Sequence, residues 1–237
     1  VWTNWEPVTA LDPHSGREVT FYQKINPALP SQQYIINAPD GKRDYDGVEL
    51  TVNKRFSNGW AFNASYVYQD SRGFIGTDLN DSQGLSDYYD NPNAHINAWG
   101  RFPLERRHQL KLIGMLKGPW GVNISGFFRY YSGQRWTRTV NSRNLGVQLR
   151  HQDETILAEK RGSSGYPALS ILDLRLEKEF RLGNFTLKLF TDVFNVLNDN
   201  RATEYNVESS NPQLVFREMA AIQAPRVFQL GFKLEFQ

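Results

Sequence analysis

Apolar and polar residues alternate along residues 226–236, close to the end of the chain. Every second position from Phe228 to Phe236 is apolar, and the positions between them are polar or glycine. A period of two is typical of a β-strand with one apolar and one polar face. The pattern therefore predicts a final strand whose aromatic face lies against lipid or against a second sheet.

The same alternation occurs in three earlier pairs of stretches, and a turn-like sequence joins the two members of each pair. The stretches and their turns are residues 47–56 and 60–68 around 57–59, residues 109–116 and 120–130 around 118–119, and residues 172–177 and 185–193 around 181–184. Gly and Asn in these turns favour tight β-hairpins. Residues 17–24 predict a further strand after a turn at 12–16, while residues 25–45 predict a loop because they contain several prolines.

The connections between these hairpins are long, whereas the turns within them are short. Residues 70–107, 132–170 and 197–225 exceed the usual length of loops in compact domains. Short turns on one rim and long loops on the other are typical of outer-membrane barrels, which place the turns in the periplasm and the loops outside the cell. Trp60 and Trp120 adjoin short turns, and Tyr68 and Tyr130 lie at the opposite strand ends, as in aromatic girdles. We therefore predict an all-β fold, an antiparallel transmembrane β-barrel segment of about seven or eight strands.

The polar faces of these strands carry unlike charges and amides, which suit a wet lumen. Four residues interrupt them, and we expect these to pack against something inside: Ile113, Met115, Phe127 and Phe190.

Composition supports this interpretation. Aromatic residues make up 14% of the 237 residues although the mean hydropathy is only −0.56, as expected when lipid covers only alternate residues of each strand. The chain has no cysteine, which excludes disulfides and thiolate metal sites, and its formal charge of +2 does not favour nucleic acid as a partner. The sequence shows neither an initiating Met nor a signal peptide at Val1, so we interpret the chain as a mature product or a fragment.

Seven short motifs carry a family resemblance. They are YDGVELTVNKRF at 45–56, ASYVY at 64–68, PWGVNISG at 119–126, YSGQ at 131–134, LRLEKEF at 174–180, DVFNVLN at 192–198 and PRV at 225–227. In their order and spacing the sequence resembles the C-terminal portion of TonB-dependent outer-membrane receptors. The likeness is greatest to the Oar-like kind with a carboxypeptidase-regulatory-like domain before the plug, and it runs from about Trp2 to the end.

The resemblance implies that residues 1–237 form part of a receptor barrel in the bacterial outer membrane, with no plug domain in this chain. Such receptors take up a ligand when a TonB complex acts on the plug, and they have 22 strands. The implied partners are outer-membrane lipid and lipopolysaccharide, the plug and TonB complex, and the barrel-assembly machinery. The family usually ends on an aromatic residue, whereas here Gln237 follows Phe236.

Two groups of residues are candidates for contact with a ligand or with the plug. Loop candidates are aromatic or cationic: Tyr88, Tyr89, Trp99, Arg135, Trp136 and Arg138. Lumen candidates lie on polar strand faces: Arg129, Arg175, Glu177, Lys188 and Asp192.

No catalytic or cofactor-binding constellation is predicted, so we expect neither enzymatic activity nor a cofactor. The four histidines are far apart and lack metal-ligand spacing. An acidic loop is the best calcium candidate, with Asp78, Asp81, Asp87 and Asp90, but it lacks the EF-hand glycine and closing glutamate, so a solvated loop is favoured.

Two alternatives remain open. The first is a self-contained small outer-membrane barrel with a structural or adhesive role, whose interior would be filled by side chains. The second is a soluble, glycan-binding β-sandwich, which requires that Phe228, Phe232 and Phe236 be buried against a second sheet.

Overall fold

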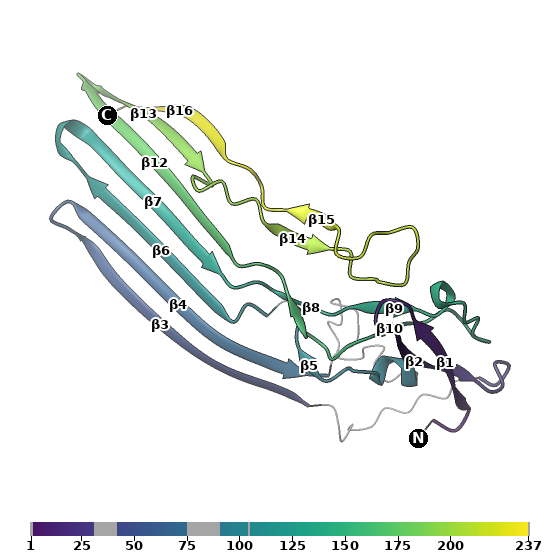
Figure 1. Cartoon of the computed structure of the whole chain (residues 1–237). Coiled ribbons are helices and arrows are strands. Elements are labelled where there is room, and N and C mark those ends of the chain that lie inside the picture. The colour runs from purple at the N-terminus through teal and green to yellow at the C-terminus, as the bar shows by residue number, and fades with distance from the viewer. Residues whose placement is uncertain (1, 31–41, 75–90, 104, 237) are drawn as a thin grey trace.

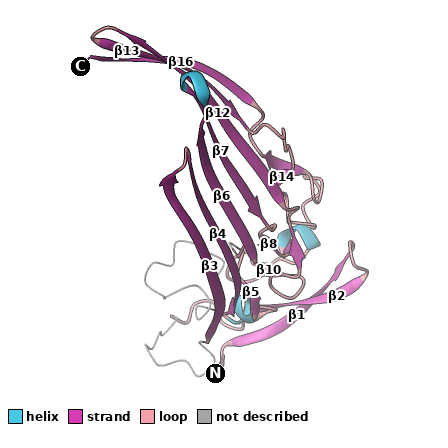
Figure 2. Cartoon of the chain, turned by 90° about the vertical axis from the view of Figure 1, so that its left-hand side faces the viewer, coloured by secondary structure: helices cyan, strands magenta, loops and turns pink. Residues whose placement is uncertain are grey.

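The computed structural model describes residues 2–30, 42–74, 91–103 and 105–236, and two regions make up its fold. One region is a long curved sheet, here called the wall, and the other is an assembly of hairpins and loops at one end of it, here called the cap (Figures 1 and 2). Among the described residues, no helix has the length and apolar character needed to cross a membrane.

The wall contains seven long strands that follow one another in chain order across the sheet. They are β3 (Arg43–Ser57), β4 (Trp60–Gly73), β6 (His108–Lys117), β7 (Val122–Tyr131), β12 (Leu169–Leu182), β13 (Phe185–Phe194) and β16 (Val227–Phe236). Every neighbouring pair is antiparallel, as the alternation predicted. In the described part of the chain, β3 and β16 do not pair with each other, so the sheet is an open barrel segment.

Short turns connect the strands at the end of the wall opposite the cap (Figure 1). Asn58 and Gly59 have φ values of 54° and 83°, the left-handed conformation that a tight hairpin turn requires. Trp120 was predicted to begin a strand, and this is wrong. It lies in the 3-10 turn η3 (Pro119–Gly121) with φ 58° and is 84% exposed, because a hydrogen bond from the Gly118 amide to the Val122 carbonyl closes the turn before β7 begins.

The hairpin turn predicted at residues 181–184 is shorter than expected. Arg181 and Leu182 still pair with Thr186 and Phe185, so only Gly183 and Asn184 form the turn. The first long strand also begins earlier than predicted, at Arg43 rather than at residue 47.

Cross-strand register gives the wall two distinct faces. Leu112 lies opposite Ala64 on one side and Phe128 on the other, and this row continues through residues that are apolar in nearly every strand. Large apolar side chains elsewhere on this face remain exposed, with Leu230 at 83% and Phe232 at 74%. No described element covers them, so the soluble sandwich hypothesis is wrong and this is the face predicted to meet lipid.

The cap combines an N-terminal hairpin with the segments that link the wall strands. Its elements are β1 (Trp5–Asp12), β2 (Arg17–Lys24), η2 (Pro92–His95), β5 (Gly100–Arg101), β8 (Arg135–Trp136), β9 (Thr139–Asn141), η4 (Arg143–Leu145), β10 (Thr155–Leu157), β11 (Ser164–Gly165), β14 (Ala202–Tyr205) and β15 (Met219–Ile222). The strand predicted at 17–24 is confirmed as β2, whereas β1 was not predicted.

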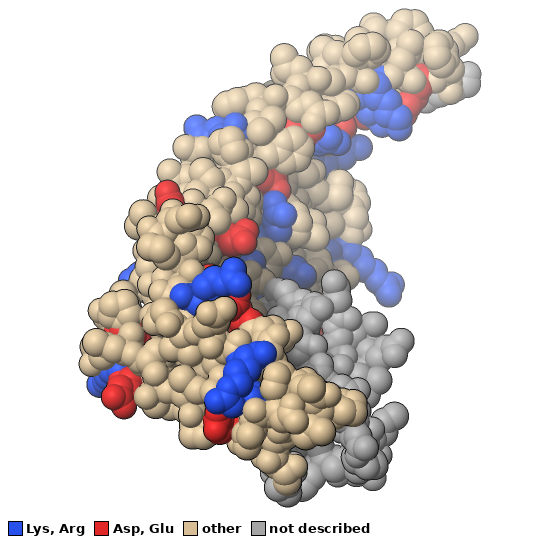
Figure 3. Space-filling view, turned by 90° about the vertical axis from the view of Figure 1, so that its right-hand side faces the viewer, with Lys and Arg blue, Asp and Glu red and all other residues tan. Residues whose placement is uncertain are grey.

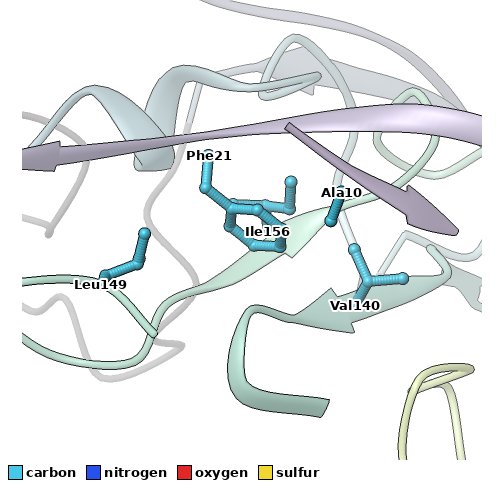
Figure 4. Close-up of a cluster of buried hydrophobic side chains, with 5 residues drawn as sticks. All are labelled: Ala10, Phe21, Val140, Leu149 and Ile156. Carbon is cyan, nitrogen blue, oxygen red and sulfur yellow. The ribbon is translucent and has the colours of Figure 1, made fainter. Parts of the chain in front are cut away.

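The hydrophobic core lies in the cap. Phe21 from β2 and Val140 from β9 are fully buried, and Ala10, Leu149 and Ile156 pack around them (Figure 4). The hairpin β1–β2 is thus fastened to a segment more than 100 residues later in the chain. This core holds the long connections in a defined arrangement at the end of the wall.

Candidate functional site

One face of the wall is apolar, and the opposite face carries the charged residues predicted to line the lumen. Register places all five on this face: Arg129, Arg175, Glu177, Lys188 and Asp192. Figure 3 shows acidic and basic side chains along the hollowed side of the wall. The sequence pattern therefore identified which residues share the polar face.

Ion pairs between neighbouring strands neutralise most of these charges. Arg175 donates two hydrogen bonds to Asp192, at 2.6 and 2.7 Å, in the bidentate geometry that makes such pairs strong. Arg129 pairs with Asp173. Two further contacts join strands on this face: Lys188 with Glu235 at 2.9 Å, and the Asn123 amide with Glu177 at 3.1 Å.

A hollow of about 570 Å³ lies against the middle strands of the wall. Two of its lining residues, Ile113 and Met115, remain 49% and 44% exposed, and Phe127 lies beside them. Polar side chains complete the lining, including Asn63 and Arg175. The polar face thus has an exposed apolar patch, which is costly in water and suits a surface that another part of the protein covers.

Phe190, also predicted to pack inside, is already covered within the wall. Its ring lies over Gly231, where a Cβ atom would be only 2.4 Å from the ring. The Arg175 guanidinium lies 4.3 Å from the centre of the same ring. Ile113 and Met115 therefore differ from Phe190, because they face open space.

A second, smaller pocket of about 260 Å³ lies between the end of β4 and the cap, and it is here called the rim pocket. Four cationic side chains and an indole line it: Arg72, Arg101, Arg135, Lys160 and Trp99. Gly162 closes one side of the pocket and has a φ of 67°. A Cβ atom there would lie only 2.7 Å from the Arg101 carbonyl oxygen. Only glycine allows these two segments to approach so closely.

Asp70 organises the cations beside the rim pocket. Its carboxylate accepts hydrogen bonds from Arg72 at 2.8 and 2.9 Å, from Arg107 at 2.6 Å and from Arg101 at 3.4 Å. Burial lowers the pKa of Arg135, Arg101 and Arg107 lower it further, and the carboxylates of Glu105 and Asp70 act in the opposite direction. Among the described residues that line or adjoin the pocket, cations outnumber carboxylates.

Of the predicted loop residues, the structure brings Trp99 and Arg135 together in the rim pocket. Trp136 is 8% exposed and packs against the rings of Tyr166, Tyr205 and Phe216 inside the cap. Tyr88 and Tyr89 lie outside the described residues.

Arg138 is also internal. Its guanidinium donates to Asp12 at 2.7 Å, to Glu159 at 3.0 Å and to Ser209 at 2.8 Å, so its charge joins the N-terminal hairpin to the rest of the cap. Burial raises the pKa of Asp12, but hydrogen bonds from Ser15, Arg138 and the His14 amide outweigh it and hold that pKa below its usual value.

The sequence did not reveal Arg72, Arg101 and Lys160 as members of one site. Asp70 and Arg72 lie on the same strand face as Tyr68, and this spacing was the one sequence signal that pointed to the site. The pairing of Arg72 with Arg101 across β4 and β5 depends on how the loop returns, which no local pattern reports.

No group of three or more potential metal ligands occurs among the described residues. His151 contacts Glu154 at 3.0 Å and packs against Trp5, a structural arrangement within the cap. The acidic loop considered for calcium, from Asp78 to Asp90, lies outside the described residues.

Comparisons with known proteins agree with this architecture. The family model for outer membrane beta barrel domains matches residues 3–142. The TonB-dependent transporter Oar of Myxococcus xanthus is 26% identical over 187 residues, which cover 71% of this chain and 16% of that protein. The crystal structure of BauA, the ferric preacinetobactin receptor from Acinetobacter baumannii, is similar with a TM-score of 0.52 at 14% identity, covering 96% of this chain and 25% of that one. The chain thus spans a quarter or less of the length of these relatives.

Proposed function

The chain belongs to the outer-membrane β-barrel domain family, and we propose that it forms part of the barrel wall and the extracellular loops of a TonB-dependent receptor that imports a ligand. Membership places the protein in the outer membrane. The transporter and receptor named above are similar to it, which favours transport over catalysis.

One observation carries the proposal: the wall has an apolar face and a charged face, and the charged face contains an exposed apolar patch. A water-filled channel alone would not need Ile113 and Met115 beside an arginine–aspartate pair. A plug domain elsewhere in the native polypeptide would cover this patch, and the neighbouring charges would orient it. Arg129, Arg175, Glu177, Lys188 and Asp192 are then the plug-facing or ligand-facing residues of the wall.

Neighbouring residues provide a matched test of the plug contact. Met115 and Leu116 point to opposite faces and are similarly exposed, at 44% and 50%, and the chain has no native cysteine. In the native protein, a thiol–amine cross-linker at Met115→Cys should capture a segment outside this chain, identified by mass spectrometry. The same reagent at Leu116→Cys should not. Capture from Leu116→Cys alone would contradict the assignment of the lumenal face.

Uptake itself is tested in cells. Compounds removed from the medium by wild-type cells should persist in cultures of a strain lacking the protein and in cultures of a strain lacking TonB. Trp99 and Arg135, with Tyr88 and Tyr89, are the proposed capture residues in the loops, so Arg135→Gln should slow depletion of the same compound. If all three strains deplete the medium equally, the import proposal fails.

Other partners follow from the proposed membrane position. The barrel-assembly machinery would insert the strands, and the terminal β16 would present Phe236 to it. Lipopolysaccharide would surround the outer rim.

The alternative, a complete small barrel with a structural or adhesive role, requires β3 to pair with β16. Neither strand has a partner on its outer edge among the described residues, which favours additional strands between them. A heat-dependent shift in gel mobility by this chain alone in mild detergent would support the small barrel. A chain that stays unfolded under those conditions would exclude it.

A further inference from the structure

The cations of the rim pocket lie partly on the lipid side of the wall. Tyr68 lies on the apolar face and pairs with Val48 and His108, and register continues from Tyr68 without a shift to Asp70 and Arg72. Residues two apart in a strand share a face, so Arg72 lies on the same side as the lipid-facing row. Its partner across the sheet is Arg101, on the same side.

Distance along the strand places these residues just above the apolar band. Tyr68 belongs to the predicted outer aromatic girdle, and Arg72 follows it by four residues. That is about 13 Å along the strand, or about 10 Å along the membrane normal for a tilt near 40°. Asp70 and Arg107 lie at about half this height, within the polar headgroup layer, which is roughly 5–8 Å thick on each side. Arg72 lies at the outer edge of this layer.

Charge around the pocket is not balanced. In the described part of the chain, Asp70 and Glu105 are the carboxylates that pair with the cations there, and they face Arg72, Arg101 and Arg107. Arg135 and Lys160 form no ion pair among the described residues, although both line the pocket. Counted over these seven side chains, the site has a net positive charge of three.

The size of the pocket and its hydrogen-bond donors limit which anion it can bind. The pocket of about 260 Å³ is smaller than the roughly 300–1,000 Å³ typical of sites that enclose a drug-sized ligand. Guanidinium groups present paired donors that match phosphate geometry, and a lysine adds a point charge. A phosphate group fits this volume and this set of donors.

We propose that the rim pocket binds a phosphate group of an outer-leaflet lipid, the phosphorylated headgroup of lipopolysaccharide. Arg135 and Lys160 supply charges that form no ion pair among the described residues, while Arg72 and Arg101, held by Asp70, shape the site. The lipid would clamp the loops at the rim of the wall. The site shares Trp99 and Arg135 with the capture residues proposed above.

The experiment uses the native outer-membrane protein in detergent and two charge-matched double variants. R135Q/K160Q removes the two unpaired cations of the pocket, and R17Q/R143Q removes two exposed cations elsewhere in the cap. Heat-dependent gel mobility verifies that each variant folds. Binding is measured for lipopolysaccharide, for the same lipopolysaccharide after enzymatic removal of its phosphates, and for inorganic phosphate.

Wild-type protein and R17Q/R143Q should bind phosphorylated lipopolysaccharide equally, and R135Q/K160Q should bind it at least about tenfold more weakly. Dephosphorylated lipopolysaccharide should bind weakly to all three, and R135K/K160R should retain most of the binding. Equal binding by R135Q/K160Q, or undiminished binding of the dephosphorylated form, would overturn the proposal. Inorganic phosphate that binds as tightly as lipopolysaccharide would identify a free anion as the ligand and overturn the lipid assignment. The strains that lack the protein or TonB test import without any change at Arg135, so the two proposals fail independently.

Discussion

The wall and the cap differ in how they shield their apolar side chains from water. In the wall, large apolar side chains such as Leu230 and Phe232 remain exposed, and backbone hydrogen bonds between long strands hold the sheet together. In the cap, the strands are short, and Phe21 and Val140 are fully buried in a core of their own. The wall depends on lipid to cover its apolar face, whereas the cap folds around an interior like that of a water-soluble protein.

The contrast extends to the charged groups. Ion pairs of the wall line a hollow and stay accessible, as at Arg175, whose side chain is 45% exposed. The central ion pair of the cap is buried, with the Arg138 and Asp12 side chains 4% and 0% exposed. Loss of one partner should therefore be far more damaging in the cap.

The largest effect is expected from Arg138→Ala. The change leaves the Asp12 carboxylate buried without its partner, which typically costs about 3–5 kcal/mol. Hydrogen exchange should accelerate in β1, β2, β9 and β10 while β12 and β13 keep their protection. Arg143→Ala is the control, because the Arg143 side chain is 77% exposed and surface pairs contribute about 0–1 kcal/mol. Equal acceleration in the wall would show that the two regions do not fold separately.

The next effect concerns the two faces of the wall. Leu174→Arg places a cation on the apolar face near mid-strand and should cost about 2–4 kcal/mol in a bilayer. Ser125→Arg places the same side chain on the neighbouring strand but on the polar face, away from the lipid, and should cost less. Urea unfolding in lipid vesicles measures both. A larger loss for Ser125→Arg would mean that the faces are assigned the wrong way round.

The sequence predicted the wall well because its structure is local and periodic. Alternation identified each strand, and register followed from short turns at residues such as Gly59 and Gly183. The errors were also local: Trp120 continued the alternation but lies in a turn that begins with Pro119.

The cap was largely unpredictable for a physical reason. Its contacts join residues far apart in the chain, as Asp12 and Arg138 do, and local periodicity carries no information about such pairs. Arg138 was predicted to contact ligand because it is a loop cation, yet its partner decides its role. Gly133 has a similar hidden function, since a side chain there would lie 1.7 Å from the Tyr166 carbonyl.

A smaller effect tests packing within the wall. Gly231→Val forces the Phe190 ring to move, because even a Cβ atom at Gly231 would lie 2.4 Å from it. Overpacking of this kind costs about 1–3 kcal/mol. Gly114→Val is the matched control, since the nearest atom to a Cβ there is a Phe62 side-chain carbon at 3.8 Å. Unfolding in lipid vesicles should separate the two variants, and equal stability would show that the aromatic cover of Gly231 contributes nothing.

The smallest expected effect is the pH dependence of the cap, because it arises from one carboxyl group. The pKa of folded Asp12 lies below its ordinary value of 3.8. Its stabilising contribution is therefore complete above that value and is lost as the pH falls through the folded pKa. Hydrogen exchange of the Phe21 and Val140 amides, followed from pH 6 to pH 2.5, should show the cap opening more readily at the acidic end.

Asp12→Asn separates this group from the other carboxylates. The variant should be less stable at neutral pH, because Arg138 loses its charged partner, and its stability should change less steeply below about pH 4. The wall strands β12 and β13 provide an internal reference in the same samples. If Asp12→Asn and the wild-type protein lose cap protection with the same slope, Asp12 is not the group that couples the cap to pH.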